Sequence, residues 1–558
     1  MKTVKKILKY TFYVIIIIII LTILPILTFH KEPNLNPLQS FYKKGVYHIH
    51  SIFSDGKGDI AEISGAASDL KLDFVILTDH GRPNLESAQS TGWHHNVLLI
   101  GGSEFSLNCG HLAAAGFKIP AYIFPPEPQE AINEVNRDGG LTFISHPFDG
   151  KIPWTDWDVK DFTGLEVLSS YSSARKAGIF KLLFFPLQYL FHHDYALLNT
   201  LQHPEENFNK WDELNSWGRF YGIYALDAHA KLPIGKESSL NFPSYAALFN
   251  ILTVYVKIDE DLGQDPRKAA GTIISALKRG RFFNCIEAIT PANGFETHFL
   301  SDDDEIVEMG GATPASCGRI IIKLPFEFAT DVLIKKDGRI FRKIEENVRK
   351  NLEIAITEPG VYRLEIYAHE NKFSDLPWIA TNPFFIGKRQ NIPVQAAPAP
   401  KKILVNRTDF FKIEKDPESE GSLITEQSDT GEWLGGFSFR LPREPQNKDF
   451  WVALARRQQF DFSDYKGVIF GAKSEPGGRF WLEFRTGADD QKTWYRHSFP
   501  ARPQWKTIYI PFDKFHPHSG EEMPPEPSKI FALFFSINNQ IAYPGASGTL
   551  YLKNIGLY

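Results

Sequence analysis

The sequence predicts a multidomain chain: a membrane-spanning helix, then an α/β barrel, then two all-β sandwiches. Three observations lead to this fold class. Residues 10–29 carry no charge, short apolar runs alternate with helix-like segments from Gly45 to about Thr290, and turn-separated strands fill the remainder. The expected boundaries are a transmembrane anchor at 1–30, a barrel at 45–295, a small sandwich at 296–387, a linker at 388–402 and a jelly-roll sandwich at 403–558.

Bulk composition fits a folded chain of several domains. The 558 residues include 43% hydrophobic and 14% aromatic residues, an aromatic content that suits β-sheets. A formal charge of −5, without a long basic run beyond the first ten residues, does not favour a nucleic-acid partner. Three cysteines, odd in number and far apart in sequence, define no disulfide framework.

The N-terminal run predicts an uncleaved membrane anchor. Twenty uncharged residues, at about 1.5 Å each, would cross a hydrocarbon core of roughly 30 Å. A cleaved signal peptide is the alternative, but its apolar core is usually shorter and ends in small residues. Four lysines precede the run, which places the N-terminus in the cytoplasm and the rest of the protein outside it.

The alternation from Gly45 to Thr290 predicts a TIM-like barrel. Runs such as "LDFVILTDH", "LTFISHP" and "FYGIYALDAH" are nearly continuous apolar strands, as in parallel sheets buried on both faces. Their polar residues come at the carboxyl ends, where such barrels carry their chemistry. Residues 177–198 are the exception, a helix-like insertion interrupted by Pro186 and too short to cross a membrane.

The rest of the chain is rich in strands and turns. Asp337-Gly338 fits a two-residue hairpin turn in the first sandwich, and "KRQNIPVQAAPAPKK" has the composition of a linker. Strands such as "RFWLEFRT" and "KIFALFFSI" then predict the second sandwich.

Nine polar residues stand at or near the ends of the predicted barrel strands. Alternate residues of a strand share a face, so His48 and His50 should project together, and Asp227 and His229 repeat that spacing at the last strand. All nine residue types are ligands for Zn, Mn or Fe. The candidate metal ligands are His48, His50, Asp55, His80, Glu104, His111, His146, Asp227 and His229.

Six motifs in order resemble the polymerase and histidinol phosphatase (PHP) family of metal-dependent phosphoesterases: "HIHSIFSDG", "TDH", "GSE", "GHLAAAG", "SHP" and "DAH". The resemblance implies a distorted seven-stranded (β/α)7 barrel that holds two to three divalent metal ions (Mn, Fe or Zn). The resemblance also implies that Glu104 would bridge two of the metal ions and that Glu104 and Asp227 would be catalytic. The implied groups are His48, His50, Glu104 and Asp227; Asp55, His80 and His229; and Glu104, His111 and His146. Asp55 replaces a histidine found in some members, which could shift preference toward Mn or Fe.

Other residues leave two interpretations open. Asp79 could orient an imidazole or begin a helix. Arg82 and Lys231, each two residues after a candidate ligand, could contact substrate phosphate or be solvated charges, and we carry Arg82 as a candidate catalytic residue. Cys109 is more typical of an inert core residue than of a reactive thiol. The motifs do not include His94, His95, His192 or His193.

The terminal segment resembles the jelly roll of galactose-binding-like carbohydrate modules and of complex I intermediate-associated proteins. The resemblance rests on "DYKGVIFGAKSE", "WKTIYIPFDKF" and "GTLYLKNIGLY". Trp481, Arg485, Trp494 and Tyr495 could form a face that stacks on sugar, although aromatic residues at strand period are more often core. Carbohydrate is therefore one candidate partner.

Together these features predict a membrane-anchored phosphoesterase with a metal-activated water, acting outside the cytoplasm on a phosphorylated small molecule or an envelope phosphoester. Two alternatives stay open: a non-catalytic envelope-polysaccharide binding or scaffold protein with a silent barrel, and an amidohydrolase-type metal hydrolase. Neither the substrate nor the oligomeric state follows from the sequence.

Overall fold

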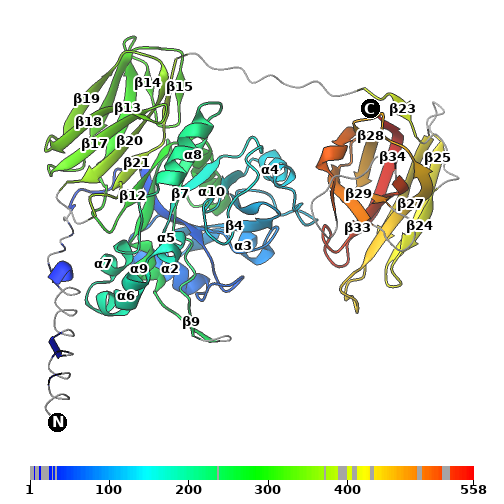
Figure 1. Cartoon of the computed structure of the whole chain (residues 1–558), viewed down its shortest axis with the longest axis horizontal. Helices are drawn as coiled ribbons and strands as arrows, with labels where there is room; N and C mark the ends of the chain where they lie inside the picture. The colour runs from blue at the N-terminus through cyan, green and yellow to red at the C-terminus, as the bar shows by residue number, and fades with distance from the viewer. Residues whose placement is uncertain are drawn as a thin grey trace. The chain divides into compact units, whose positions relative to one another are not determined.

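The structure is a computed structural model of the whole chain (Figure 1). It describes residues 34–234, 238–369, 373–387, 399–404, 411–427, 433–486, 493–517, 528 and 530–558, with scattered positions before residue 34. The chain is multidomain, with an α/β region followed by β-sandwiches, and it divides into two compact units. Unit 1 comprises residues 1–119 and 128–391, and unit 2 comprises residues 120–127 and 392–558.

The structure does not support the expected membrane anchor or the single-pass localisation. No helix among the described residues is both long and apolar enough to cross a membrane. Most of the apolar run at residues 10–29 lies outside the described residues, as does most of the expected linker at 388–402.

Seven strands of unit 1 form a ring. β8 is hydrogen-bonded to β7, and just beyond its end the backbone returns to the first strand, because Leu226 N–H donates to the Tyr47 carbonyl at 3.0 Å and Ala228 N–H to that of His48 at 3.1 Å. The strands in order are β1 (Tyr42–Ile49), β2 (Phe74–Leu77), β4 (Val97–Leu107), β5 (Gly110–Ala115), β6 (Leu141–Ile144), β7 (Gly164–Ser169) and β8 (Tyr221–Ala225).

The sequence-based fold class was wrong about this sheet as well. β5 runs antiparallel to both of its neighbours, so the ring is mixed rather than parallel. The sheet also does not end at the ring, because β1 pairs antiparallel with β11 (Leu252–Lys257), which pairs with β12 (Phe282–Ile286), which pairs with β21 (Ile379–Thr381) of the following sandwich. One sheet of sixteen strands thus joins the α/β region to that sandwich.

Helices and short strands surround the ring, and several helices begin at a side-chain cap. Asp59, Asn84, Ser244 and Asp265 accept backbone N–H bonds at the first turns of α2, α3, α9 and α10. The helices are α2 (Ile60–Asp69), α3 (Leu85–Gln89), α4 (Pro128–Arg137), α5 (Ser170–Lys176), α6 (Ile179–Phe191), α7 (His193–Leu198), α8 (Glu205–Asn215), α9 (Tyr245–Phe249) and α10 (Pro266–Lys278). The short strands are β3 (Gly92–His94), β9 (Leu232–Ile234) and β10 (Ser238–Leu240).

The sandwich of unit 1 packs the far end of the long sheet against four further strands. On the long sheet lie β15 (Ala312–Thr313), β17 (Thr330–Lys336), β18 (Arg339–Asn347), β20 (Gly360–Ala368) and β22 (Phe384–Ile386). The second sheet comprises β13 (Glu296–Ser301), β14 (Ile306–Val307), β16 (Gly318–Lys323) and β19 (Asn351–Ile356). Buried residues alternate with partly buried ones along β13 and with exposed ones along β19, as in sheets with one face in a core.

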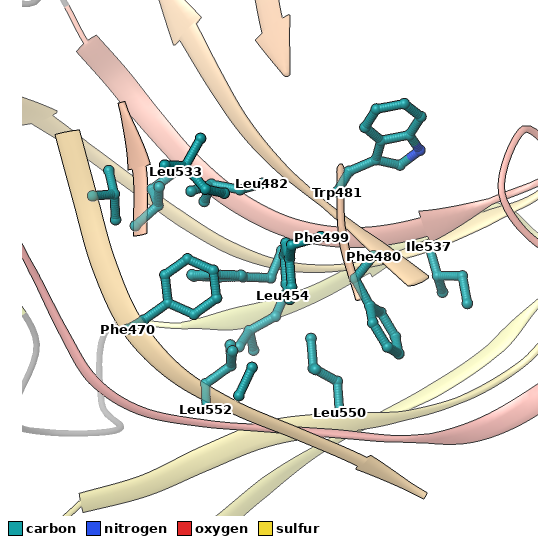
Figure 2. Close-up of a cluster of buried hydrophobic side chains, with 14 of the residues drawn as sticks. Leu454, Phe470, Phe480, Trp481, Leu482, Phe499, Leu533, Ile537, Leu550 and Leu552 are labelled. Atoms are coloured by element: carbon teal, nitrogen blue, oxygen red, sulfur yellow. The ribbon is translucent and has the colours of Figure 1, made fainter. Parts of the chain in front are cut away.

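Unit 2 is a sandwich of two antiparallel sheets around an aromatic core. Phe470, Phe480 and Phe499 lie between the sheets, whereas Trp481 points to the other side of its strand (Figure 2). One sheet contains β23 (Lys402–Ile403), β25 (Glu420–Gln427), β26 (Trp433–Arg440), β28 (Gly467–Glu475), β31 (Lys506–Pro511) and β34 (Ser547–Leu557). The other contains β24 (Lys412–Lys415), β27 (Trp451–Phe460), β29 (Gly478–Thr486), β30 (Thr493–Ala501), β32 (His516–Pro517) and β33 (Ile530–Asn538).

Residues 120–127 belong to unit 2 although their neighbours in sequence belong to unit 1. Ile123 N–H donates to the Ile541 carbonyl at 3.1 Å, and Tyr122 forms a bridge with Ala542. The chain therefore passes between the two units three times, after residues 119, 127 and 391.

Candidate metal centre

His48 and His50 stand at and just after the end of β1, and both side chains are buried. Their Nε2 atoms lie 3.1 Å apart, so the two rings converge as the sequence predicts. The local backbone is not regular, however. The register between β1 and β2 shifts at this point, and His48 has φ of 69°, in the left-handed region that non-glycine residues rarely adopt.

Glu104, on β4, lies at the centre of the nine candidate ligands, which we call the nine-residue cluster. Its side chain is 1% exposed, and both carboxylate oxygens face imidazoles. Five imidazole nitrogens surround it: Nε2 of His48 at 3.4 Å, Nε2 of His50 at 3.5 Å, Nδ1 of His80 at 3.2 Å, Nδ1 of His111 at 3.2 Å and Nε2 of His146 at 3.2 Å.

Asp55 and His229 form the more open side of the cluster. The Asp55 carboxylate is 44% exposed, and its Oδ1 lies 3.2 Å from Nε2 of His229 and 3.7 Å from Nε2 of His80. The other nitrogen of His229 contacts the Asp227 carbonyl at 3.0 Å, which leaves Nε2 facing Asp55. Asp227 completes the group, with Oδ1 3.3 Å from Nε2 of His50.

Asp79 holds the loop that carries Asp55. Its carboxylate accepts hydrogen bonds from the backbone N–H and the hydroxyl of Ser51, at 2.7 and 2.8 Å, and from the hydroxyl of Ser54 at 2.7 Å. The adjacent helix α3 is capped instead by Asn84. None of these bonds caps the helix or reaches an imidazole. Asp79 therefore has a third role beyond the two that the sequence left open, which is to hold the loop.

The cluster favours cations. Burial opposes protonation of His48, but the carboxylates of Glu166, Glu104 and Asp227 outweigh it and raise its pKa well above the ordinary value. Burial acts against ionised Asp227 as well, yet the facing histidines hold its pKa below the usual range. Burial and the neighbouring His229 lower the pKa of His50 to about 4, so its ring is a neutral, ligand-competent imidazole at pH 7.

The donor atoms fit a divalent ion. Oδ1 of Asp55 and Nδ1 of His80 and His111 are buried without a hydrogen-bond partner, although each faces the cluster, and such atoms are costly unless something satisfies them. Three groups within the described residues have ligand atoms close enough to share an ion: His50, Asp55, His80 and His229; His48, His50 and Glu104; and His80, Glu104 and His111. These groups differ from those that the family resemblance implies, because His50 also lies with Asp55 and His229, and His80 also lies with Glu104 and His111.

Glu166, on β7, was missed by the sequence analysis. It is fully buried, its Oε1 lies 2.5 Å from Nδ1 of His48, and its Oε2 accepts the backbone N–H of His146 at 2.8 Å. The bond to Nδ1 selects the His48 tautomer whose Nε2 lone pair faces the cluster. A lone carboxylate inside the apolar run "GLEVLS" was the available signal, because buried charges require partners.

Two cationic residues each follow a candidate ligand by two positions in sequence. Lys231 reaches the rim of the cluster, with Nζ 3.8 Å from Oδ2 of Asp55. Arg82 is half-buried in the loop before α3 and stays a predicted substrate contact.

Tyr171, which the sequence did not single out, places its ring 5.1 Å from that of His229. Burial raises the pKa of the Cys109 thiol to about 12, in keeping with an inert residue.

The expected sugar-stacking face of unit 2 is only partly present. Tyr495 points into the core opposite Phe484, and Trp481 is fully buried, so neither presents a free ring. Arg485 and Trp494, directly opposite each other on β29 and β30, remain on the outer face. The Arg485 guanidinium lies 3.5 Å from the Trp494 ring and 4.2 Å from that of Phe534.

Comparisons with known proteins give only distant similarities. No family model matches the chain, and no curated protein matches it. A solved two-domain protein from Bacteroides vulgatus, described as containing a predicted PHP-like metal-dependent phosphoesterase, is 15% identical and covers 64% of this chain and 98% of its own, with a TM-score of 0.31. A family 11 carbohydrate-binding module from Clostridium thermocellum, solved with a β-1,3-1,4-mixed-linked tetrasaccharide, is 16% identical and covers 29% of this chain and 96% of its own, with a TM-score of 0.24. These similarities are too weak to assign an activity.

Proposed function

We propose that the α/β region is a divalent-metal-dependent hydrolase of phosphate esters. The observation that carries this proposal is the buried Glu104 carboxylate within 3.5 Å of five imidazole nitrogens. A carboxylate shared by five imidazoles suits ions bound side by side, as in sites that hydrolyse phosphate esters.

The ligand set supports Mn, Fe or Zn as the ions. It consists of imidazoles and carboxylates without a thiolate, which are the donors these metals share. His48, His50, Glu104 and Asp227 would hold one ion, and the groups around Asp55 and His111 would hold the others. Bound there, divalent ions would lower the pKa of a water and neutralise charge on the phosphoryl group.

The chain's own residues take positioning roles in this proposal. Glu166 fixes the His48 ring, and Asp79 fixes the loop that carries Asp55. Lys231, at the exposed side of the cluster, and Arg82, two residues after His80, would contact phosphoryl oxygens of the substrate. Glu104 and Asp227 are the proposed catalytic carboxylates because they lie at the convergence of the imidazoles.

Purified protein, stripped of metal and reloaded in turn with Mn, Fe and Zn, would be assayed for phosphate release from a library of phosphomonoesters and phosphodiesters. We expect hydrolysis with at least one ion and none after chelation. Stoichiometric metal without hydrolysis of any phosphoester would instead favour the non-catalytic scaffold, and turnover of amides or lactones in its place would favour an amidohydrolase-type enzyme.

A second function, carbohydrate binding, is proposed for unit 2. Phe534 and Trp494 are stacked at 6.0 Å and 11°, with the Arg485 guanidinium close to both rings, and Nε of Arg485 is buried without a hydrogen-bond partner. Phe534 and Arg485 are themselves buried, so the partly exposed Trp494 is the ring that would stack on a sugar, with the Arg485 guanidinium beside it. Affinity electrophoresis in soluble polysaccharides would test it: Trp494→Ala should abolish retardation, whereas Trp505→Ala, an exposed tryptophan outside this group, should not. Equal retardation of wild type and Trp494→Ala would refute this face.

A further inference from the structure

A pocket of about 250 Å³ adjoins the nine-residue cluster in unit 1. It is bounded by the loop after β6, the end of β7, helix α5 and the first turn of α8. The pocket lies somewhat below the range of roughly 300–1,000 Å³ that holds drug-sized ligands. Its size therefore fits one small ring rather than a nucleoside or an oligomer.

His146 belongs to both the cluster and the pocket. Its Nε2 lies 3.2 Å from Oε1 of Glu104, while its Nδ1 is buried without a hydrogen-bond partner. The side chain is 7% exposed, so an unsatisfied nitrogen here is costly. A ligand in the pocket would therefore lie beside the reacting phosphoryl group.

Two side-chain amides of the pocket, those of Gln202 and Asn207, have free hydrogen-bonding groups. The Gln202 amide makes no hydrogen bond within the described part of the chain. The Asn207 amide donates to the Glu166 carbonyl at 3.1 Å, and its Oδ1 accepts no bond from any described residue. Helix α8 begins at the pocket without a side-chain cap, so N–H groups of its first turn are also available as donors.

The two cationic side chains at the pocket, Arg175 and Lys176, are already paired with carboxylates. Arg175 lies 3.2 Å from Oδ1 of the buried Asp149, whose Oδ2 accepts the Ser172 hydroxyl at 2.9 Å. Lys176 lies 3.7 Å from Glu206, and Glu205 adds a further carboxylate at the rim. Among the described residues at the pocket, no lysine or arginine is without a carboxylate partner, so a neutral ligand is favoured over a second phosphate or a carboxylate.

We propose that this pocket binds the leaving group of the phosphoester, and that the leaving group is a single neutral sugar. The inference rests on the proposed hydrolase. Water adds to phosphorus as the bond from phosphorus to the sugar oxygen breaks, and a proton from that water ends on the sugar oxygen, which gives inorganic phosphate and the free sugar. Phe148, which lines the pocket, supplies the apolar surface that a sugar ring also needs.

The first test compares kcat/KM for hexose 6-phosphates and hexose 1-phosphates with kcat/KM for 4-nitrophenyl phosphate. In wild type, at least one hexose phosphate should be preferred. Gln202→Ala should lower the ratio of kcat/KM for that hexose phosphate to kcat/KM for 4-nitrophenyl phosphate about tenfold, the size of one lost hydrogen bond. Gln202→Trp should lower the ratio further by filling the pocket. Gln89→Ala, an exposed glutamine outside the pocket, is the matched control and should leave the ratio unchanged. A ratio unaltered by Gln202→Trp would overturn the subsite while leaving the hydrolase intact.

The second test does not depend on turnover. Isothermal titration of metal-free protein with glucose, mannose and galactose should give millimolar binding of at least one sugar, weakened about tenfold by Gln202→Ala. Sugar binding without hydrolysis of any phosphoester would support the pocket and refute the hydrolase. Hydrolysis of 4-nitrophenyl phosphate without any sugar binding or sugar-phosphate preference would refute the pocket alone.

Discussion

The carboxylate of Glu166 contacts Nδ1 of His48 at 2.5 Å, and its second oxygen accepts the backbone N–H of His146 at 2.8 Å. One buried side chain thus fixes a ring on β1 and the backbone of a candidate ligand that follows β6. This relationship makes Glu166 a positioning residue for two members of the nine-residue cluster.

Glu166→Gln should lower metal affinity about 10- to 100-fold, because the amide holds the His48 tautomer less strongly and presents an N–H to that of His146. Metal titration monitored by elemental analysis would measure the loss, and high metal concentration should rescue the rate. Glu213→Gln, an exposed change on α8, serves as the control. Unchanged affinity in Glu166→Gln would show that the contact is purely structural.

Glu104→Gln should lose more bound metal from the nine-residue cluster than Asp55→Asn does. Glu104 faces five imidazoles and is buried, whereas Asp55 lies at the open side. Bound metal per chain would be measured on the same preparations as the phosphatase rate. We expect Glu104→Gln to lose metal at two positions and Asp55→Asn at no more than one. The reverse order would refute a bridging role for Glu104.

Arg82→Ala should raise KM for a phosphoester by more than it lowers metal content, because the proposed contact is with substrate and not with the ions. Steady-state kinetics at saturating metal would separate the two effects. If the variant loses metal in proportion to its activity, Arg82 acts through the cluster and the assigned role is wrong.

Acid should destabilise unit 1 through Glu287. Burial acts to raise the pKa of this carboxyl, but Lys44 at 2.9 Å and the hydroxyls of Tyr255 and Thr253 outweigh it and hold the pKa below its ordinary value. A lowered folded-state pKa means that the stabilisation is present above the unfolded-state value and is lost as pH falls through the folded-state value. Thermal unfolding between pH 7 and pH 3 should therefore show a steeper loss in wild type than in Glu287→Gln, which should itself be about 3–5 kcal/mol less stable at pH 7. Parallel pH profiles would contradict this.

Unit 2 should need residues 120–127 for full stability. The Ser498 hydroxyl donates to Glu127 at 2.9 Å, and the segment adds a backbone bond at Ile541. A fragment from Lys402 to Tyr558 should therefore melt several degrees higher when a peptide of residues 119–128 is added. A peptide with Glu127→Ala is the control and should give a smaller shift. No shift with either peptide would show that the fragment is complete without the segment.

The sequence predicts the proximity of the nine residues from their places at the ends of predicted strands, which a ring of strands brings together. Glu104 differs from this pattern, because it lies within β4, which continues to Leu107. Glu166 escaped notice because its partner, His48, comes from a distant strand and no local spacing links them. The continuous sheet was missed for a similar reason. The pairing of Cys285 with Ile379 joins residues whose contact no local pattern encodes, so local patterns predict a separate sandwich. The placement of residues 120–127 in unit 2 is likewise a long-range property.

Three members of the nine-residue cluster, His48, His146 and Asp227, have positive φ angles of 69°, 29° and 52°. Each such backbone costs of order 1–3 kcal/mol that a glycine would largely avoid. A glycine at position 48 would relieve its strain, but it would leave the buried Glu166 carboxylate without its imidazole partner. The strained backbone and the buried contacts of this side chain are therefore kept or lost together.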